Sequence, residues 1–374
     1  QYYQSIMPIL IQIIENAKDQ RYRALRAKAI DAATLVAMAV GQDVFRPQAK
    51  PVVDAMVEMQ KNALSDDPIH AYLPSCWVRI CTLFVQDFHP LMETVWPTVM
   101  KRAMQEPDIA LLDAGEELSE DQQSGDWEFA NFQGKKIGIR TSTLEEKCAA
   151  VENIQAYAEI LKSSFAPYCD EVLNLLVSLF SFEYHDGVKI ASVSALVPVF
   201  KCLLEASSEK GIDSAHVLNK WYPVLKELID CIGSLDCSES EFICQVFDTL
   251  GQCILIFGER SFNSLELLQL LITTMVDLLK EISRAFSLFE LEASKDPTNE
   301  PDEDAIDNEE NILIEMSKLL RNLVQFYYGA LKGLLGKEIL PFFTAGLTSS
   351  RPIVRHVSIC FFSDLIEFSG PLES

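Results

Sequence analysis

The side chains best suited to chemistry in this sequence form a short set in which aromatic residues alternate with carboxylates. Asp126, Trp127, Glu128 and Phe129 follow one another in a segment, 106–131, that contains no Lys or Arg. An aromatic face beside carboxylates can hold a Lys or Arg side chain by cation–π attraction together with charge pairing. The chemistry expected here is recognition of a basic partner. The alternative is that Trp127 and Phe129 pack back onto the protein and only anchor the segment.

Two acidic insertions carry most of the charge of the chain. Residues 106–131 contain nine acids and no base, and residues 290–310 contain ten acids and one Lys, within a formal net charge of −24. Such runs either form solvated loops without a partner or attract Lys- and Arg-rich peptides. The second insertion is interpreted as a flexible excursion. The candidate partner-binding residues lie in the first: Glu116, Glu117, Glu120, Asp121, Asp126, Trp127 and Glu128.

The sequence has no motif for catalysis or metal binding. Its five His residues are dispersed, and it contains no HExxH, Cys/His zinc spacing, Gly-x-Ser-x-Gly or Walker A loop. Ten scattered cysteines without a Cys-x-x-Cys pair are typical of buried free thiols in a reducing compartment. We therefore expect neither an enzyme nor a bound cofactor or metal.

The overall composition favours a globular chain with basic partners. Hydrophobic residues make up 49%, and 31 Lys and Arg stand against 55 Asp and Glu. This charge argues against direct binding of nucleic acid or of an anionic membrane. No membrane insertion is expected either, because the most apolar stretch, 265–282, carries four charged residues. A chain that begins at Gln1 without Met is interpreted as a fragment.

Amphipathic helices must position these groups. Ile6, Leu10, Ile13 and Ile14 follow the helical i, i+4, i+7, i+8 pattern, whereas strict alternation over a strand length is not found. Such helices bury their apolar stripes only by stacking. The pairs expected are 3–17 with 20–40, 46–63 with 68–86, 88–105 with 143–163, 165–182 with 187–206, 214–232 with 238–257, 262–293 with 309–332, and 337–348 with 352–369.

The pair starts recur every ~40–50 residues once the insertions are set aside, as in HEAT or armadillo arrays. We therefore expect an all-α chain: one array over 1–374, interrupted within repeats by acidic insertions at 106–142 and 294–308. A Pro falls in the first helix of several pairs, where it bends the helix. These prolines are Pro8, Pro97, Pro223 and Pro341.

Acids and cations recur at the turns between paired helices. An acid at the turn can cap free N–H groups, and the cation that follows at the start of the second helix can pair with an acid of a neighbouring repeat. This predicts a ladder of charges through the stack, with a structural role. Its expected members are Asp19, Arg23, Arg26, Asp186, Lys189 and Arg355.

Several segments resemble the importin-beta (karyopherin-beta) superfamily, and in particular its importin-five branch. They include YYQSIMPILIQIIENA, RYRALRAKAIDAATLVAMAVG, DIALLDAGEE, GDWEF, GIRTSTLEEKCAAVENIQAYAEILK and FEYHDGVKIASVSALVPVF, in the same order and spacing along nearly the whole chain. The resemblance implies a right-handed HEAT-repeat solenoid of about seven helical pairs. It also implies that the chain is the C-terminal part of a longer array.

The resemblance further implies a nuclear transport receptor that shuttles between cytoplasm and nucleus. The expected partners are cargo proteins with basic nuclear localisation signals, such as ribosomal proteins and histones, together with the Ran GTPase and nuclear pore proteins. Ran in its GTP form would release the cargo. The alternative is a general HEAT-repeat scaffold subunit, for example of a phosphatase or chromatin complex. The residues carried over from the family are the acidic Asp126–Phe129 segment and the HDGVK turn around Asp186.

Overall fold

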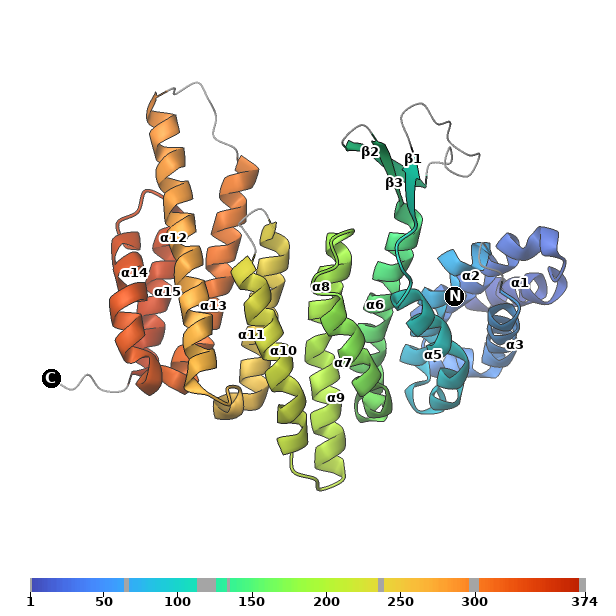
Figure 1. Ribbon diagram of the computed structural model, residues 1–374. Helices are drawn as coiled ribbons and strands as arrows, with labels where there is room; N and C mark the ends of the chain where they lie inside the picture. Colours follow the sequence, from blue (N-terminus) through green and yellow to red (C-terminus); the bar gives the residue numbers. More distant parts are fainter. Residues whose placement is uncertain are drawn as a thin grey trace. The chain divides into compact units, whose positions relative to one another are not determined.

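The structure, a computed structural model, is almost entirely helical, as the sequence predicts (Figure 1). It describes residues 2–63, 67–112, 126–132, 135–234, 239–295 and 303–369. The chain divides into two compact units. One comprises Gln1–Leu175 and Glu183–Ala191, and the other comprises Leu176–Phe182 and Ser192–Ser374.

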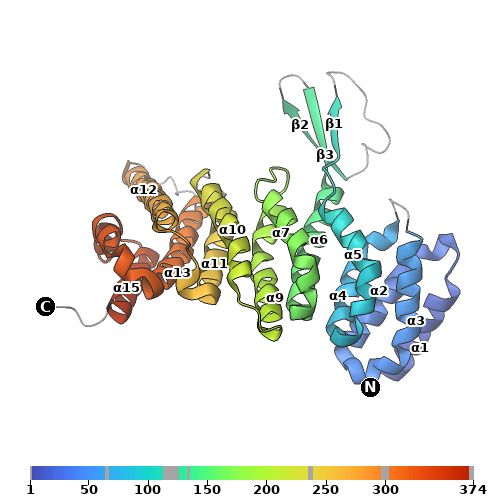
Figure 2. The same cartoon turned by 60° about the horizontal axis from the view of Figure 1, so that its bottom comes forward.

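The first unit stacks its helices in two layers (Figure 2). Helices α1, α3 and α5 contact one another in sequence, and helices α2, α4 and α6 do the same beside them. Each helix therefore buries its apolar stripe against its partner and the next pair. The bounds are α1 Tyr3–Asn16, α2 Arg23–Val40, α3 Gln42–Lys61, α4 Leu73–Leu83, α5 His89–Ala103, α6 Thr141–Leu161 and α7 Cys169–Ser178, followed by α8 Asp186–Ser194, which crosses the division between the units.

The second unit repeats this two-layered arrangement. Helices α9, α11, α13 and α15 contact one another in order, with α10, α12 and α14 beside them as pair partners. Phe200, Trp221 and Phe257 meet at centroid distances of 5.4–5.7 Å and form an aromatic core for the first of these pairs. The bounds are α9 Leu196–Glu209, α10 Ala215–Ser234, α11 Ser240–Phe257, α12 Leu265–Lys295, α13 Glu303–Leu334, α14 Leu340–Gly346 and α15 Pro352–Phe368.

The second acidic insertion is shorter than the sequence suggests. Helix α12 continues to Lys295 and α13 begins at Glu303. The described residues of the expected 294–308 excursion therefore lie in these two helices. The interpretation of a flexible excursion is therefore wrong for these parts, and residues 296–302 lie outside the described residues. A helix already packed along most of its length extends at little cost, because elongation adds one hydrogen bond for each residue that it fixes.

Two helical stretches, Asp186–Glu209 and Ser240–Arg260, are long and apolar enough to cross a membrane by length and composition. Most of the apolar window of each is buried inside the protein, as is usual for core helices. The cysteines that the structure describes are all free, as expected. Burial raises the pKa of the Cys81 thiol to about 12, which keeps it protonated at neutral pH.

Cations on the second helix of a pair reach back to the end of the first. Arg26 of α2 is 5% exposed and donates from Nε to the Ile14 carbonyl near the end of α1, 2.8 Å away. Lys147 of α6 is 4% exposed and donates to the carbonyls of Ala103, at 2.6 Å, and Gln105, at 3.0 Å, after α5. The last carbonyls of a helix have no partner within it, and the helix dipole favours a cation there.

Replacing Lys147 with Met should lower the free energy of unfolding by about 2 kcal/mol, because two buried carbonyls lose a charged donor. The exposed Lys101 of α5 provides the matched control, since Lys101→Met removes the same charge from the surface and should change stability by less than about 0.5 kcal/mol. Urea unfolding followed by circular dichroism measures both. Equal stability of the two variants would show that the Lys147 contacts do not stabilise the pair.

Candidate functional site

The first acidic insertion contains a small antiparallel sheet, which the sequence analysis did not predict. Strands β1 Ile109–Leu112, β2 Trp127–Phe132 and β3 Lys135–Arg140 lie in the order β1-β3-β2. In Figures 1 and 2 the sheet extends away from the helices between α5 and α6. These strands do not change the all-α fold class. The helix-period search missed them because cross-strand contacts stabilise them, and such contacts follow no helical period.

A close aromatic–glycine contact holds β2 to β3. Phe129 lies opposite Gly138 in the register, and a Cβ atom on Gly138 would lie 2.3 Å from the Phe129 ring. The ring therefore covers the glycine directly. Trp127 stacks on Phe129 with centroids 6.2 Å apart, and the Lys136 ammonium lies 4.5 Å from the Phe129 centroid. Phe129 thus already has an internal cation–π partner.

The sheet is tied to the start of α6. The Thr141 backbone N–H donates to the Asp126 carbonyl at 2.8 Å, and its hydroxyl donates to the same oxygen at 3.0 Å. On the other side of β3, the Arg140 N–H donates to the Asp108 carbonyl at 3.1 Å. Since Lys147 fixes the chain as it leaves α5, both ends of the insertion are anchored at α6.

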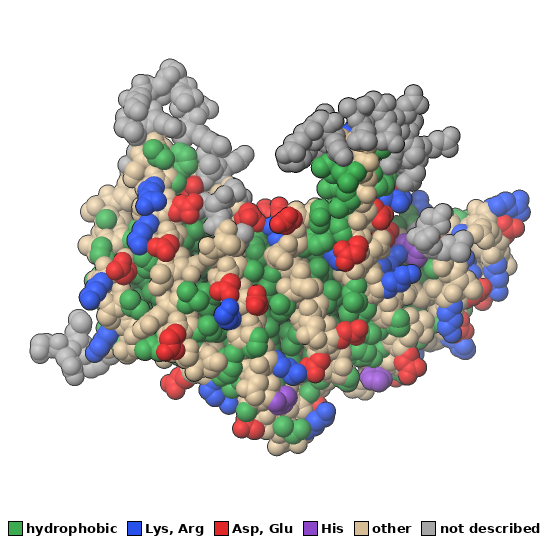
Figure 3. Space-filling view, viewed as in Figure 1, with side chains coloured by type: hydrophobic (Ala, Val, Ile, Leu, Met, Phe, Trp, Pro, Cys, Tyr) green, Lys and Arg blue, Asp and Glu red, His purple; other side chains and the backbone are tan. Residues whose placement is uncertain are grey.

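The two faces of the sheet differ in charge. Trp127, Phe129, Lys136 and Arg140 share one face by register and strand alternation, which we call the aromatic face. The opposite face, which we call the acidic face, begins with Asp126 and Glu128, both exposed. The acidic face also carries Ile109 and Leu111, exposed by 43% and 66%. In Figure 3 hydrophobic side chains gather on the surface where the sheet leaves the helices.

The predicted partner-binding residues are therefore only partly placed. Asp126 and Glu128 lie together on the acidic face, while Trp127 lies half-buried on the aromatic face. The aromatic pair packs on itself and on β3, which is closer to the anchoring alternative than to an open aromatic platform. The other four predicted residues, Glu116, Glu117, Glu120 and Asp121, lie outside the described residues.

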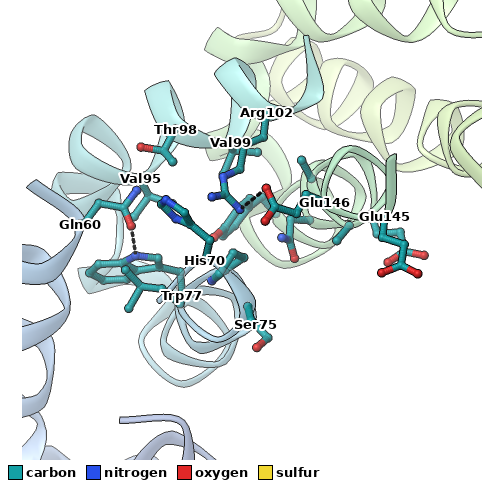
Figure 4. A pocket seen from close by; sticks show the side chains of 18 of the residues that line it. Gln60, His70, Ser75, Trp77, Val95, Thr98, Val99, Arg102, Glu145 and Glu146 are labelled. Carbon is teal, nitrogen blue, oxygen red and sulfur yellow. Dashed lines mark hydrogen bonds and ion pairs between the residues drawn. The ribbon is translucent and has the colours of Figure 1, made fainter. Parts of the chain in front are cut away.

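A cavity of about 510 Å³ lies between α4, α5 and the first half of α6 (Figure 4). Trp77 and Val95 form a buried apolar wall, and the Trp77 indole N–H donates to the Gln60 side-chain oxygen at 3.2 Å. Glu145 and Glu152 are exposed at the α6 rim of the cavity. This shape suits an apolar side chain of a partner, with the rim carboxylates favouring a basic neighbour.

A half-buried ion pair crosses the cavity. Arg102 of α5 and Glu146 of α6 lie 3.5 Å apart, and the Arg102 side chain is 11% exposed. Burial lowers the pKa of the Arg102 guanidinium, and the Glu146 carboxylate opposes that shift. Among the described residues, no group of three or more His, Cys, Asp or Glu side chains could hold a metal ion.

The expected ladder residues have several kinds of partner. Arg23 pairs with Asp67 in the turn of the next helical pair, and Arg26 pairs with Glu58 of α3 at 2.8 Å. Asp19, by contrast, pairs with the neighbouring Arg21 at 3.1 Å and also accepts from the Arg21 N–H.

The later ladder residues form local contacts. Lys189 and Asp186 pair within α8 at 2.9 Å. Arg355 donates to the carbonyls of Ser349, at 2.7 Å, and Ser350, at 2.9 Å, just after α14. The structural ladder through the whole stack stays a prediction.

Sequence reasoning missed Gly138, Lys136 and the cavity. The signal for the sheet was present: Trp127 and Phe129 alternate with Glu128, and Ile137 and Ile139 flank a glycine. β-branched and aromatic residues in two runs separated by two residues indicate a hairpin. The cavity had no such signal, because its lining comes from five separate helical segments.

Comparison with known proteins supports the resemblance found in the sequence. No protein-family model matches the chain. It is 29% identical over 375 residues to importin subunit beta-3 of Saccharomyces cerevisiae and 23% identical over 381 residues to a probable importin-5 homologue of Dictyostelium discoideum. Both matches include 99% of this chain and 33% of the relative, so the chain spans about a third of the length of these proteins.

Solved structures of Kap121p match the fold along the chain. The Kap121p crystal structure superposes with a TM-score of 0.80 and 26% identity, over 99% of this chain and 33% of Kap121p. Kap121p bound to RanGTP superposes with a TM-score of 0.77. Other Kap121p structures contain Nup53p or Ste12p. The chain is thus structurally similar to the HEAT-repeat solenoid of Kap121p, and the expected fold class is confirmed.

Replacing Gly138 with Val should loosen the sheet, because the new side chain must displace the Phe129 ring. We expect amide hydrogen exchange over residues 127–132 to accelerate about tenfold, the equivalent of about 1.4 kcal/mol of overpacking. Gly329→Ala is the control, since no atom lies within 4 Å of a Cβ there. Hydrogen exchange measured by mass spectrometry distinguishes the Gly138→Val variant from the Gly329→Ala control. An unchanged exchange rate in the Gly138→Val variant would contradict the Phe129–Gly138 contact.

Proposed function

We propose that this chain, which is homologous to importin beta-3 and importin-5 proteins and shares the fold of the importin-beta superfamily member Kap121p, is part of a nuclear import receptor. The observation that carries the proposal is agreement in sequence and in fold along 99% of the chain. In this role the complete protein shuttles between cytoplasm and nucleus.

The proposed partners of the complete protein follow from the Kap121p complexes and from charge. Kap121p structures with RanGTP and with Nup53p support Ran and nuclear pore proteins as partners. The strong negative charge of this chain supports cargo with basic nuclear localisation signals, such as ribosomal proteins and histones. Neither direct nucleic-acid binding nor membrane insertion forms part of the proposal.

We assign the capture of basic segments to the first acidic insertion. Its nine carboxylates lie within 26 residues, and Asp126 and Glu128 are exposed on the acidic face of the sheet. Exposed ion pairs contribute little individually, about 0.2–1 kcal/mol each, so several must act together. Attraction of this kind accelerates encounter and declines with salt, because the Debye length is only about 10 Å at 0.1 M.

Stacked pairs suit a receptor that must hold and release its partners. Among the described helices, each pair makes its main contacts with its neighbours, so small rotations between successive pairs add along an array. Binding of Ran to the complete receptor would shift this equilibrium and release the cargo, since a ligand favours the conformation that it binds more tightly.

Neutralising Glu116, Glu117, Glu120, Asp121 and Asp126 to their amides in the complete protein should weaken binding of a Lys-rich signal peptide about tenfold at low salt. The salt dependence of the dissociation constant should also become shallower, because fewer charge contacts remain. Fluorescence anisotropy at several salt concentrations measures both quantities.

The control changes the same number of charges in the second insertion: Asp296, Glu300, Asp302, Glu303 and Asp304. It should leave peptide affinity nearly unchanged if the first insertion is the site, and equal weakening would point to net charge alone. Unchanged binding at low salt in the first variant would remove this insertion from the mechanism. Addition of GTP-loaded Ran should release the peptide from the complete protein, and persistence of the complex would contradict the receptor proposal.

A further inference from the structure

In the part of the insertion that the structure describes, no strand pairs with the outer edge of β2, which we call the open edge. In the order β1-β3-β2, β2 pairs with β3 on one side and has no described strand on the other. The Thr141 N–H bonds to the Asp126 carbonyl, so these two residues form a hydrogen-bonded pair at the end of the ladder. Hydrogen-bonded pairs alternate along an antiparallel ladder. The backbone N–H and C=O groups of Trp127, Phe129 and Asn131 therefore point away from β3, toward the open edge.

The open edge presents different chemistry on its two faces. On the acidic face, a strand added to β2 would place its side chains beside the exposed carboxylates of Asp126 and Glu128. On the aromatic face, its alternate side chains would lie beside Trp127 and Phe129, where Lys136 already stands over the Phe129 ring. A cation is therefore favoured on the first face, and on the second it would meet a like charge.

We propose that β2 binds an extended peptide as a fourth strand, and that the peptide alternates Lys or Arg with apolar residues. The peptide backbone bonds to Trp127, Phe129 and Asn131, its basic side chains pair with Asp126 and Glu128, and its apolar side chains cover the aromatic face. Main-chain bonds then supply affinity, and the alternation supplies specificity. The inference rests on the proposed capture of basic segments. It adds that the bound segment is extended and alternates basic with apolar residues.

Four synthetic peptides of the same amino-acid composition test the backbone requirement with the complete chain. The first alternates Lys and Val, and the second has the same residues in two blocks. The third and fourth are the alternating peptide with a single N-methyl group on one of two adjacent central residues. The alternating peptide should bind at least about tenfold more tightly than the block peptide. The N-methyl group should weaken binding about tenfold when it falls on a residue whose N–H faces β2, and little when shifted by one residue, because one removed bond is worth about 1.4 kcal/mol.

Variants of the protein test the edge itself. Asn131→Pro removes an outward N–H and leaves the bonds to β3 intact, as prolines at sheet edges do, so it should weaken the alternating peptide several-fold. Glu128→Gln should weaken it and reduce the salt dependence, whereas Glu159→Gln, an exposed carboxylate on α6 outside the cavity, should not. Hydrogen exchange over residues 135–140 confirms that each variant keeps its sheet.

The outcomes separate this inference from the proposed function. Equal binding of the alternating, block and both N-methylated peptides, with sensitivity to Glu128→Gln retained, would overturn strand addition and leave the acidic capture proposal standing. Failure of every basic peptide to bind at low salt would overturn both. Binding that depends on alternation and on one methylation register supports the fourth strand. An isotope-edited amide I band of the bound peptide at the β-sheet position supports it independently.

Discussion

A buried cation that reaches from the second helix of a pair to the carbonyl groups ending the first is the contact on which the stacking depends. Arg26 and Lys147 do this for α1 and α5, and the half-buried Arg355 contacts the carbonyls of Ser349 and Ser350 beyond the end of α14. The unpaired carbonyls at a helix end would otherwise be buried without donors. Because the cation sits near the start of the second helix, it also fixes the turn between the two.

The sequence predicts this framework well and its contacts less well. Apolar spacing such as Ile6, Leu10 and Ile13 places the helices within a few residues, since the helical period is local. Arg355 was expected to pair with an acid of a neighbouring repeat, whereas the structure shows backbone carbonyls as its partners. The sequence analysis did not single out Lys147, whose partners are backbone carbonyls as well. Every residue has a backbone carbonyl, so the sequence does not indicate which carbonyl a given side chain will contact. The sheet was missed for a related reason: Phe129 and Gly138 are nine residues apart, and their contact follows no period.

The candidate site combines two surfaces that share one helix. The first residue of α6 holds the sheet through Asp126, and its next turns line the cavity with Glu145 and Glu146. Charge in this region is sorted by side: Lys136 and Arg140 lie on the aromatic face, and Asp126 and Glu128 lie on the other. Among the described residues, the exposed carboxylates of Asp126 and Glu128 therefore lie on one face, whereas the Asp108 carboxylate lies 3.9 Å from Arg140. Such sorting requires the strands, because a disordered loop of the same composition presents all of its charges in every direction.

The chain leaves α5 and returns to α6 at neighbouring points, with the Asp108 carbonyl and the Arg140 N–H bonded to each other. A segment inserted between Asp108 and Arg140 therefore does not change the distance between the end of α5 and the start of α6. Evolution is therefore free to lengthen, shorten or rewrite this excursion while the surrounding repeats keep their packing. The same closeness makes the sheet a transferable module, which a short linker could replace or which another pair of helices with equally close ends could accept.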